Sequence, residues 1–215
     1  MSKIFLVIGI LAGLAFLAVI AMAILTPWMD RWGARDEEIE AEFPGDGFVA
    51  NPSRSSNRAI EVNASPEEIY PWLVQIGADK GGWYSHTWLE THLLRCPNTN
   101  ADRIHPEWQD LKVGDLVKMC PDETAPPAYI VAEIHPGYAI VMGHKEAGEW
   151  VDLYQFVLLP QADGTTRLVL RTRTMMDGGF WTLIHPGVFL MERGLLTGVK
   201  TRVEAGTEPV IALQN

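Results

Sequence analysis

Aromatic and ionisable side chains gather in two loop-forming parts of the sequence, residues 81–86 and 100–109. Binding and catalytic groups concentrate on loops of this kind. His105 and Glu107 stand two residues apart and could form an acid–base pair, to which His86 or Tyr84 could add a proton donor or acceptor. The alternative, which we favour, is structural: the charged groups fix a long loop, and neighbouring tryptophans cover the edge of the core.

Other kinds of chemistry find little support. The six histidines are scattered, and no element carries the His-x-x-x-His or Glu-x-x-His spacing of a metal site. The sequence has neither a Gly-x-Ser-x-Gly elbow nor a glycine-rich phosphate loop. A net charge of −10 and a pI near 5.0 disfavour nucleic acid, whose phosphates need a basic patch. We therefore expect no metal, no cofactor and no nucleic-acid partner.

The two cysteines, Cys96 and Cys120, match no metal-ligand spacing and no redox motif. They could form one disulfide if the domain faces an oxidising compartment. We favour the alternative of two unpaired, partly buried thiols, because free cysteine behaves as a small apolar residue.

The N-terminal part of the chain is apolar. Residues 4–25 contain no charged residue and no proline. As a helix they would rise about 33 Å, which matches the roughly 30 Å hydrocarbon core of a bilayer. Trp28 and Trp32 suit the membrane interface. We predict one transmembrane anchor over residues 1–28; the alternative is a cleaved signal peptide, whose apolar core is usually shorter.

Two properties of this anchor stay open. Lys3 opposes Arg31 and Arg35 under the positive-inside rule, so the side of the membrane that holds the rest of the chain is undecided. Gly9 and Gly13 lie four residues apart and could support a homodimer through close helix approach, although small residues are common in membrane helices anyway.

An acidic segment follows the anchor. Residues 30–46 hold seven acidic residues against two arginines, and glycine, proline and serine follow, so we predict a solvated stalk over residues 29–56. A folded domain should occupy residues 57–207, and residues 208–215 should be a C-terminal tail.

The folded domain is expected to be α+β. The predicted order is a strand over 58–63, a helix begun by the capping box of Ser65 and Glu68, and a second helix over 85–94. Strands over 115–119, 129–135, 138–144, 150–159 and 167–175 follow, with short links that favour an antiparallel meander. A long helix over 182–204 closes the domain, with an apolar stripe that packs on the sheet.

Several short sequence motifs accompany this order of elements: residues 64–73 (ASPEEIYPWL), 75–77 (QIG), 81–85 (GGWYS), 88–90 (WLE), 100–109 (NADRIHPEWQ) and 113–115 (VGD). Together they resemble the SRPBCC superfamily of START, birch-allergen-like and polyketide cyclase/dehydratase-like proteins, in a bacterial membrane-anchored subfamily. The resemblance covers about residues 57–205. It implies a helix-grip fold, in which a curved antiparallel sheet wraps a long C-terminal helix and an apolar ligand lies between them.

Side chains on the facing surfaces of that sheet and helix, with nearby loop aromatics, are the candidate ligand contacts. They are Trp83, Tyr84, Trp108, Leu168, Leu170, Thr172, Thr174, Met176, Val188, Met191 and Leu195. The alternative is a filled core made of the same residues. Gly187, Gly194 and Gly198 would leave room for a cavity, or else let the helix sit close to the sheet.

On the opposite face of the last strand, Arg167, Arg171 and Arg173 alternate. They could form an anion site, but we favour a solvated outer face with cross-strand charge pairs. We therefore expect a membrane-tethered binding domain for a lipid or other apolar small molecule. The alternatives are a cyclase/dehydratase- or hydrolase-like enzyme acting on an apolar substrate, and a non-catalytic interaction domain with a filled core.

Overall fold

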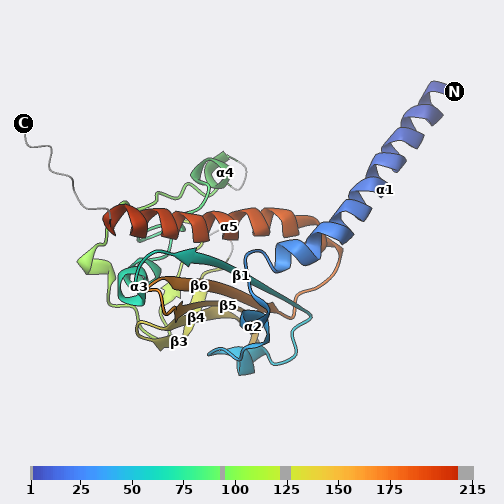
Figure 1. Ribbon diagram of the computed structural model, residues 1–215. Coiled ribbons are helices and arrows are strands. Elements are labelled where there is room, and N and C mark those ends of the chain that lie inside the picture. Colours follow the sequence, from blue (N-terminus) through green and yellow to red (C-terminus); the bar gives the residue numbers. More distant parts are fainter. Residues whose placement is uncertain (1, 93–94, 122–126, 208–215) are drawn as a thin grey trace, which may run out of the picture.

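The computed structural model describes residues 2–92, 95–121 and 127–207. Helix α1 (Ser2–Asp30) projects away from the other elements, and only its C-terminal end contacts them (Figure 1). Across the described residues, no helix combines the length and hydropathy needed to cross a membrane. The tail expected over 208–215 lies outside the described part of the chain.

Six antiparallel strands form one sheet in the order β1-β6-β5-β4-β3-β2. They are β1 (Arg54–Val62), β2 (Leu116–Val117), β3 (Tyr129–His135), β4 (Ala139–Glu146), β5 (Glu149–Pro160) and β6 (Thr166–Thr174). The predicted meander is confirmed for β3 to β6. The first strand begins earlier than expected, at Arg54, because it pairs with the whole length of β6.

Helix α5 (Gly179–Thr207) lies along one face of the sheet, and α3 (Pro66–Val74) covers the same face (Figure 1). The predicted start of α3 is confirmed, since the Glu68 carboxylate accepts a hydrogen bond of 2.8 Å from the Ser65 amide. Helix α4 (Thr87–His92) is shorter than the predicted 85–94, of which 93–94 are not described. The α+β class is confirmed, and the sheet with its long C-terminal helix has the helix-grip arrangement.

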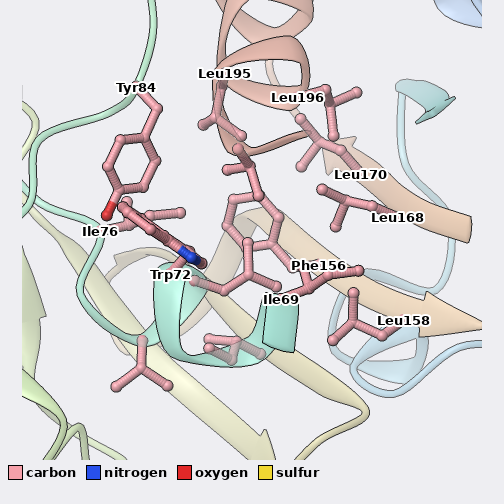
Figure 2. Close-up of a cluster of buried hydrophobic side chains, with 14 of the residues drawn as sticks. Ile69, Trp72, Ile76, Tyr84, Phe156, Leu158, Leu168, Leu170, Leu195 and Leu196 are labelled. Atoms are coloured by element: carbon pink, nitrogen blue, oxygen red, sulfur yellow. The ribbon is translucent and has the colours of Figure 1, made fainter. Parts of the chain in front are cut away.

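The core lies between α5, α3 and the inner face of the sheet (Figure 2). Leu168 and Leu170 of β6 are fully buried there, beside Phe156 of β5 and Leu196 of α5. This end of the space between helix and sheet is filled by apolar side chains.

The N-terminal half of α5 is rotated relative to the prediction. Val188 and Met191 were expected to face the sheet, but the buried positions of this half-helix are Phe189 and Glu192, and Val188 is 38% exposed. Apolar residues occupy both sides of this half-helix, so periodicity alone could not choose the packed side. The helix also begins at Gly179, before the predicted start at residue 182, and it contains Pro186.

The expected solvated stalk is wrong, because much of it packs on the outer face of the sheet. Helix α2 (Asp36–Glu40) and the 3-10 turn η1 (Asp46–Val49) lie there, with Phe43 and Val49 buried. The expected solvated arginine face is wrong for the same reason. Arg167 Nε donates a hydrogen bond to the Glu38 carboxylate at 2.6 Å, and Arg171 Nη1 donates one to the Asp46 carboxylate at 2.6 Å. The acidic segment neutralises arginines that would otherwise be exposed.

Candidate functional site

A buried ion pair joins the inner face of the sheet to α5. Arg58 of β1 contacts Glu192 of α5, and only 1% and 5% of the two residues are exposed. The Arg58 guanidinium also donates to the Met29 carbonyl at 2.9 Å and to the Ser56 hydroxyl at 2.7 Å. Burial raises the pKa of Glu192, against the opposing effect of Arg58. Charges this deep in a protein are costly unless paired, so this pair marks a candidate site.

Two tyrosines lie on the same inner face. Tyr129 of β3 and Tyr154 of β5 have ring centroids 5.4 Å apart, and Trp83 packs 5.9 and 6.0 Å from them. Burial raises the pKa of both phenols, and the charge of Glu192 raises each further. No hydrogen bond joins either hydroxyl to another described residue. Both phenols therefore stay protonated and remain available as donors near Glu192.

A histidine–carboxylate pair continues this polar row. His144 of β4 and Asp152 of β5 are register partners on the inner face, with Nδ1 and Oδ2 2.8 Å apart. His144 Nε2 lies 2.9 Å from the Pro127 carbonyl, and its ring lies 4.3 Å from the Tyr129 ring. Burial alone would lower the pKa of His144, but hydrogen bonding and the charge of Asp152 outweigh it and raise that pKa.

The C-terminal end of α1 is bound to this cluster. Asp30 Oδ1 lies 2.7 Å from His185 Nε2 of α5 and 3.5 Å from Arg58. The Trp28 and Phe189 rings meet edge to face at 5.3 Å. The buried Nδ1 of His185 has no hydrogen-bond partner among the described residues. Helix α1 is thus held directly against the polar end of the space between α5 and the sheet.

The predicted acid–base pair forms, but on the surface. His105 Nδ1 lies 3.1 Å from Glu107, whose side chain is 64% exposed, and the His105 ring stacks on Trp108 at 4.1 Å. The His105 amide donates to the Gln75 side chain at 3.0 Å. These contacts pin the loop around η2 (Pro106–Trp108). This matches the structural interpretation.

The other two catalytic candidates lie apart from that pair. The Tyr84 hydroxyl is 3.0 Å from Gln75 Nε2, and burial raises the pKa of Tyr84 to about 12. His86 is exposed, and its ring lies against Gly194 of α5. The four candidates therefore do not converge on one reacting centre.

The predicted ligand contacts divide into three places. Trp83, Thr172 and Thr174 lie with the polar groups of the inner face. Leu168, Leu170, Leu195 and Tyr84 belong to the filled core. Trp108 is half-buried, and Met176, Val188 and Met191 are partly exposed near the N-terminal half of α5.

The glycines of α5 do not make room for a cavity. A Cβ on Gly198 would come within 1.8 Å of the Tyr84 carbonyl oxygen, and one on Gly194 would meet Ser85 and His86. A Cβ on Gly187 would meet nothing within 4 Å. Gly194 and Gly198 therefore let the 84–86 segment cross close to the helix. They neither open a cavity nor bring the helix close to the sheet, which were the two interpretations of the sequence.

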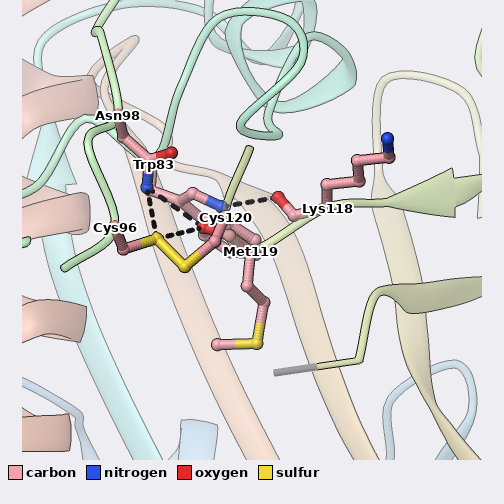
Figure 3. The surroundings of a disulfide bond; sticks show 6 residues. All are labelled: Trp83, Cys96, Asn98, Lys118, Met119 and Cys120. Carbon is pink, nitrogen blue, oxygen red and sulfur yellow. Dashed lines mark hydrogen bonds between the residues drawn. A yellow bond between two sulfur atoms is a disulfide. The ribbon is translucent and has the colours of Figure 1, made fainter. Parts of the chain in front are cut away.

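The two cysteines are bonded to each other, so the favoured interpretation of free thiols is wrong (Figure 3). Cys96 and Cys120 are both buried, and their Cα atoms are 5.2 Å apart. Next to the disulfide, Asn98 Nδ2 donates to the Met119 carbonyl at 3.0 Å and Trp83 Nε1 donates to the Lys118 carbonyl at 3.0 Å. The disulfide thus fixes the segment that holds Trp83 against the tyrosines.

Sequence reasoning missed the polar residues that the fold brings together. They are Arg58, Tyr129, His144, Asp152, Tyr154 and Glu192. The only available indication was that the alternation of side chains along each strand places the strand residues on the inner face. That pattern applies equally to their apolar neighbours. Within the described ranges, no group of three or more His, Cys, Asp or Glu residues could hold a metal ion.

A separate recess of about 400 Å³ lies on the outer side of the sheet, between α2 and the β3–β4 turn. Phe43, Tyr138 and Leu159 line it together with the charged side chains Arg35 and Glu38. It is broad and open, and it lies on the opposite side of the sheet from the buried polar groups. We assign no function to it.

Solved structures similar to this chain share little sequence with it. The Aha1 dimer from Colwellia psychrerythraea is 16% identical, with a TM-score of 0.45, over 72% of this chain and 98% of that one. The self-sacrificing resistance protein CalC from Micromonospora echinospora is 10% identical, with a TM-score of 0.44, over 72% and 97%. An HSP90 activator from Plasmodium falciparum is 15% identical, with a TM-score of 0.35, over 59% and 77%. No protein-family model and no curated protein matches the sequence. The class of the chain, an α+β protein with a helix-grip arrangement, therefore rests on its own strand order and on α5.

Proposed function

We propose that this chain is a membrane-attached binding domain for a lipid or other apolar small molecule with a polar end. The ligand lies between α5 and the inner face of the sheet. Tyr129 and Tyr154 donate hydrogen bonds to its polar end, and the Arg58–Glu192 pair sets the charge around it. Aromatic and aliphatic neighbours take its apolar part.

One observation carries this proposal: the phenols of Tyr129 and Tyr154 pack together on the inner face of the sheet, make no hydrogen bond to another described residue, and both feel the charge of Glu192. Enclosed polar groups are usually hydrogen-bonded to protein or to a bound molecule, so two neighbouring phenol donors with no described protein partner suit the polar end of a ligand. Trp83 packs on both rings and makes the surroundings apolar.

Support for membrane attachment comes from α1. Its sequence over residues 4–25 is uncharged, and Phe5, Leu11 and Phe16 are all at least 60% exposed. Large exposed apolar surfaces mark contacts with membranes or partners. A lipid ligand suits this location, since it would enter from the bilayer itself. Close helix approach at Gly9 and Gly13 would add a homodimer.

The Cys96–Cys120 disulfide favours one side of the membrane. Disulfides persist in oxidising compartments and are rare where thiols are kept reduced. We therefore place the sheet and α5 on the oxidising side of the membrane to which α1 attaches.

The test is native mass spectrometry of the full chain, extracted from membranes in mild detergent. We expect a stoichiometric apolar compound, which lipid extraction then identifies. The double variant Tyr129→Phe/Tyr154→Phe removes only the two hydroxyls and should weaken retention by about thirtyfold, since each of the two hydrogen bonds contributes on the order of 1 kcal/mol. Tyr138→Phe, at a turn where the residue is 37% exposed, is the control. An empty wild-type protein, or equal loss in the control, contradicts the proposal.

A further inference from the structure

We infer that the outward face of the N-terminal half of α5 is a second membrane-contact surface, which lies flat on the bilayer beside α1. This inference rests on the proposed membrane attachment. It adds a contact by the folded domain itself to the one made by α1.

The outward face of this half-helix is apolar and unpartnered. Phe180 is 66% exposed, Leu183 77% and Leu190 39%, and Met175 just before the helix is 49% exposed. The positions 180, 183, 187 and 190 recur on one side of a helix. The core uses the opposite side, where Phe189 and Glu192 are buried.

The charge pattern agrees with contact to lipid. Residues 178–191 contain no Asp, Glu, Lys or Arg. His185, the one titratable side chain among them, faces inward and bonds Asp30. Trp181 lies in the first turn, and tryptophan prefers the headgroup region of a bilayer. Helices that lie in the plane of the interface bury an apolar face at the boundary of headgroups and acyl chains, and the outward side of this half-helix offers such a face.

The position of this face relative to α1 identifies the bilayer as its occupant. Phe189 and His185 of α5 contact Trp28 and Asp30 at the C-terminal end of α1. Figure 1 shows α1 leaving the domain from the same end at which α5 begins. Trp28 is itself 55% exposed, so apolar surface continues from α1 onto α5. A bilayer that receives α1 therefore lies next to the first turns of α5.

Photo-crosslinking in the full chain tests this contact. The residue p-benzoylphenylalanine replaces Leu183 in one variant, Leu11 of α1 in a second and Leu116 in a third. Leu116 is the matched control, because it is 56% exposed on β2, at the edge of the sheet farthest from β1. Each variant is reconstituted in vesicles of phosphatidylethanolamine and phosphatidylglycerol and irradiated. The mass of the protein and of any crosslinked adduct is then measured by mass spectrometry.

We expect a phospholipid adduct at Leu183 and at Leu11 and none at Leu116. An adduct at Leu11 without one at Leu183 overturns the inference and leaves membrane attachment by α1 intact. A Leu183 adduct to a second copy of the chain or to another protein overturns it in favour of a protein interface. Phospholipid adducts at all three positions would also overturn it, since the face would not be singled out. No adduct at either Leu11 or Leu183 overturns both the inference and the proposed attachment.

Discussion

Arg58 of β1 and Glu192 of α5 form an ion pair inside the protein, although 134 residues separate them in the sequence. The pair joins the sheet to the helix at the point where α1 also docks, through the Met29 carbonyl and Asp30. Breaking a buried pair is more harmful than never having had it, because the remaining charge stays buried without its partner.

The two halves of this pair should not be equivalent. Glu192→Leu leaves an arginine that cannot lose its charge and keeps only the longer contact with Asp30, so we expect a loss of about 3 kcal/mol in the free energy of unfolding. Arg58→Met leaves a carboxyl group whose raised pKa lets it become neutral, so its loss should be smaller. Thermal unfolding of the full chain in detergent measures both.

The double variant Arg58→Met/Glu192→Leu should recover part of the stability, because it leaves no charge unpaired. Asp36→Ala, which breaks the exposed pair with Arg31, is the control and should change stability by less than about 1 kcal/mol. Equal losses for the two single variants would contradict this account of the ion pair.

The His144–Asp152 pair should make stability depend on pH. The folded-state pKa of His144 is raised above its ordinary value of 6.5, so protonation favours the folded state. This contribution is fully present below pH 6.5 and is lost as the pH rises through the folded-state pKa. We expect the melting temperature to fall across that window, and His144→Gln to flatten the fall. His92→Gln, at an exposed position, should leave the profile unchanged.

The Cys96–Cys120 disulfide closes a loop of sequence separation 24 and should contribute about 3 kcal/mol, chiefly by restricting the unfolded chain. Reduction should therefore lower the melting temperature of the wild-type protein. Cys96→Ser/Cys120→Ser should melt at the lower temperature with or without reductant. A wild-type protein that is insensitive to reductant would refute this prediction.

Two glycines of α5 provide a matched pair. Gly198→Ala should destabilise the protein by about 1–3 kcal/mol, because the new methyl group meets the Tyr84 carbonyl oxygen. Gly187→Ala adds its methyl group to open space and should instead stabilise the helix by up to about 1 kcal/mol. Urea unfolding measures the free energy of unfolding of both variants. A change of the same sign in that free energy for both would contradict the packing described.

Local sequence patterns were enough to predict most elements of the domain. The capping box at Ser65 and Glu68 begins α3, and the alternation along β6 separates leucines on the inner face from arginines on the outer face. Such patterns are set by neighbours a few residues away, so the sequence alone determined the α+β class and the antiparallel meander.

Contacts between distant segments were decided only by the tertiary structure. The composition of the acidic segment predicted a solvated stalk, but in the fold Glu38 and Asp46 form ion pairs with arginines of β6. The cysteines match no sequence motif, so the disulfide could not be predicted from local sequence. Helix α5 has apolar residues on both sides, so its packed side could not be predicted locally either. The polar residues of the candidate site come from β1, β3, β4, β5 and α5. Their partners are chosen by strand order and helix docking, and no spacing within the chain encodes those.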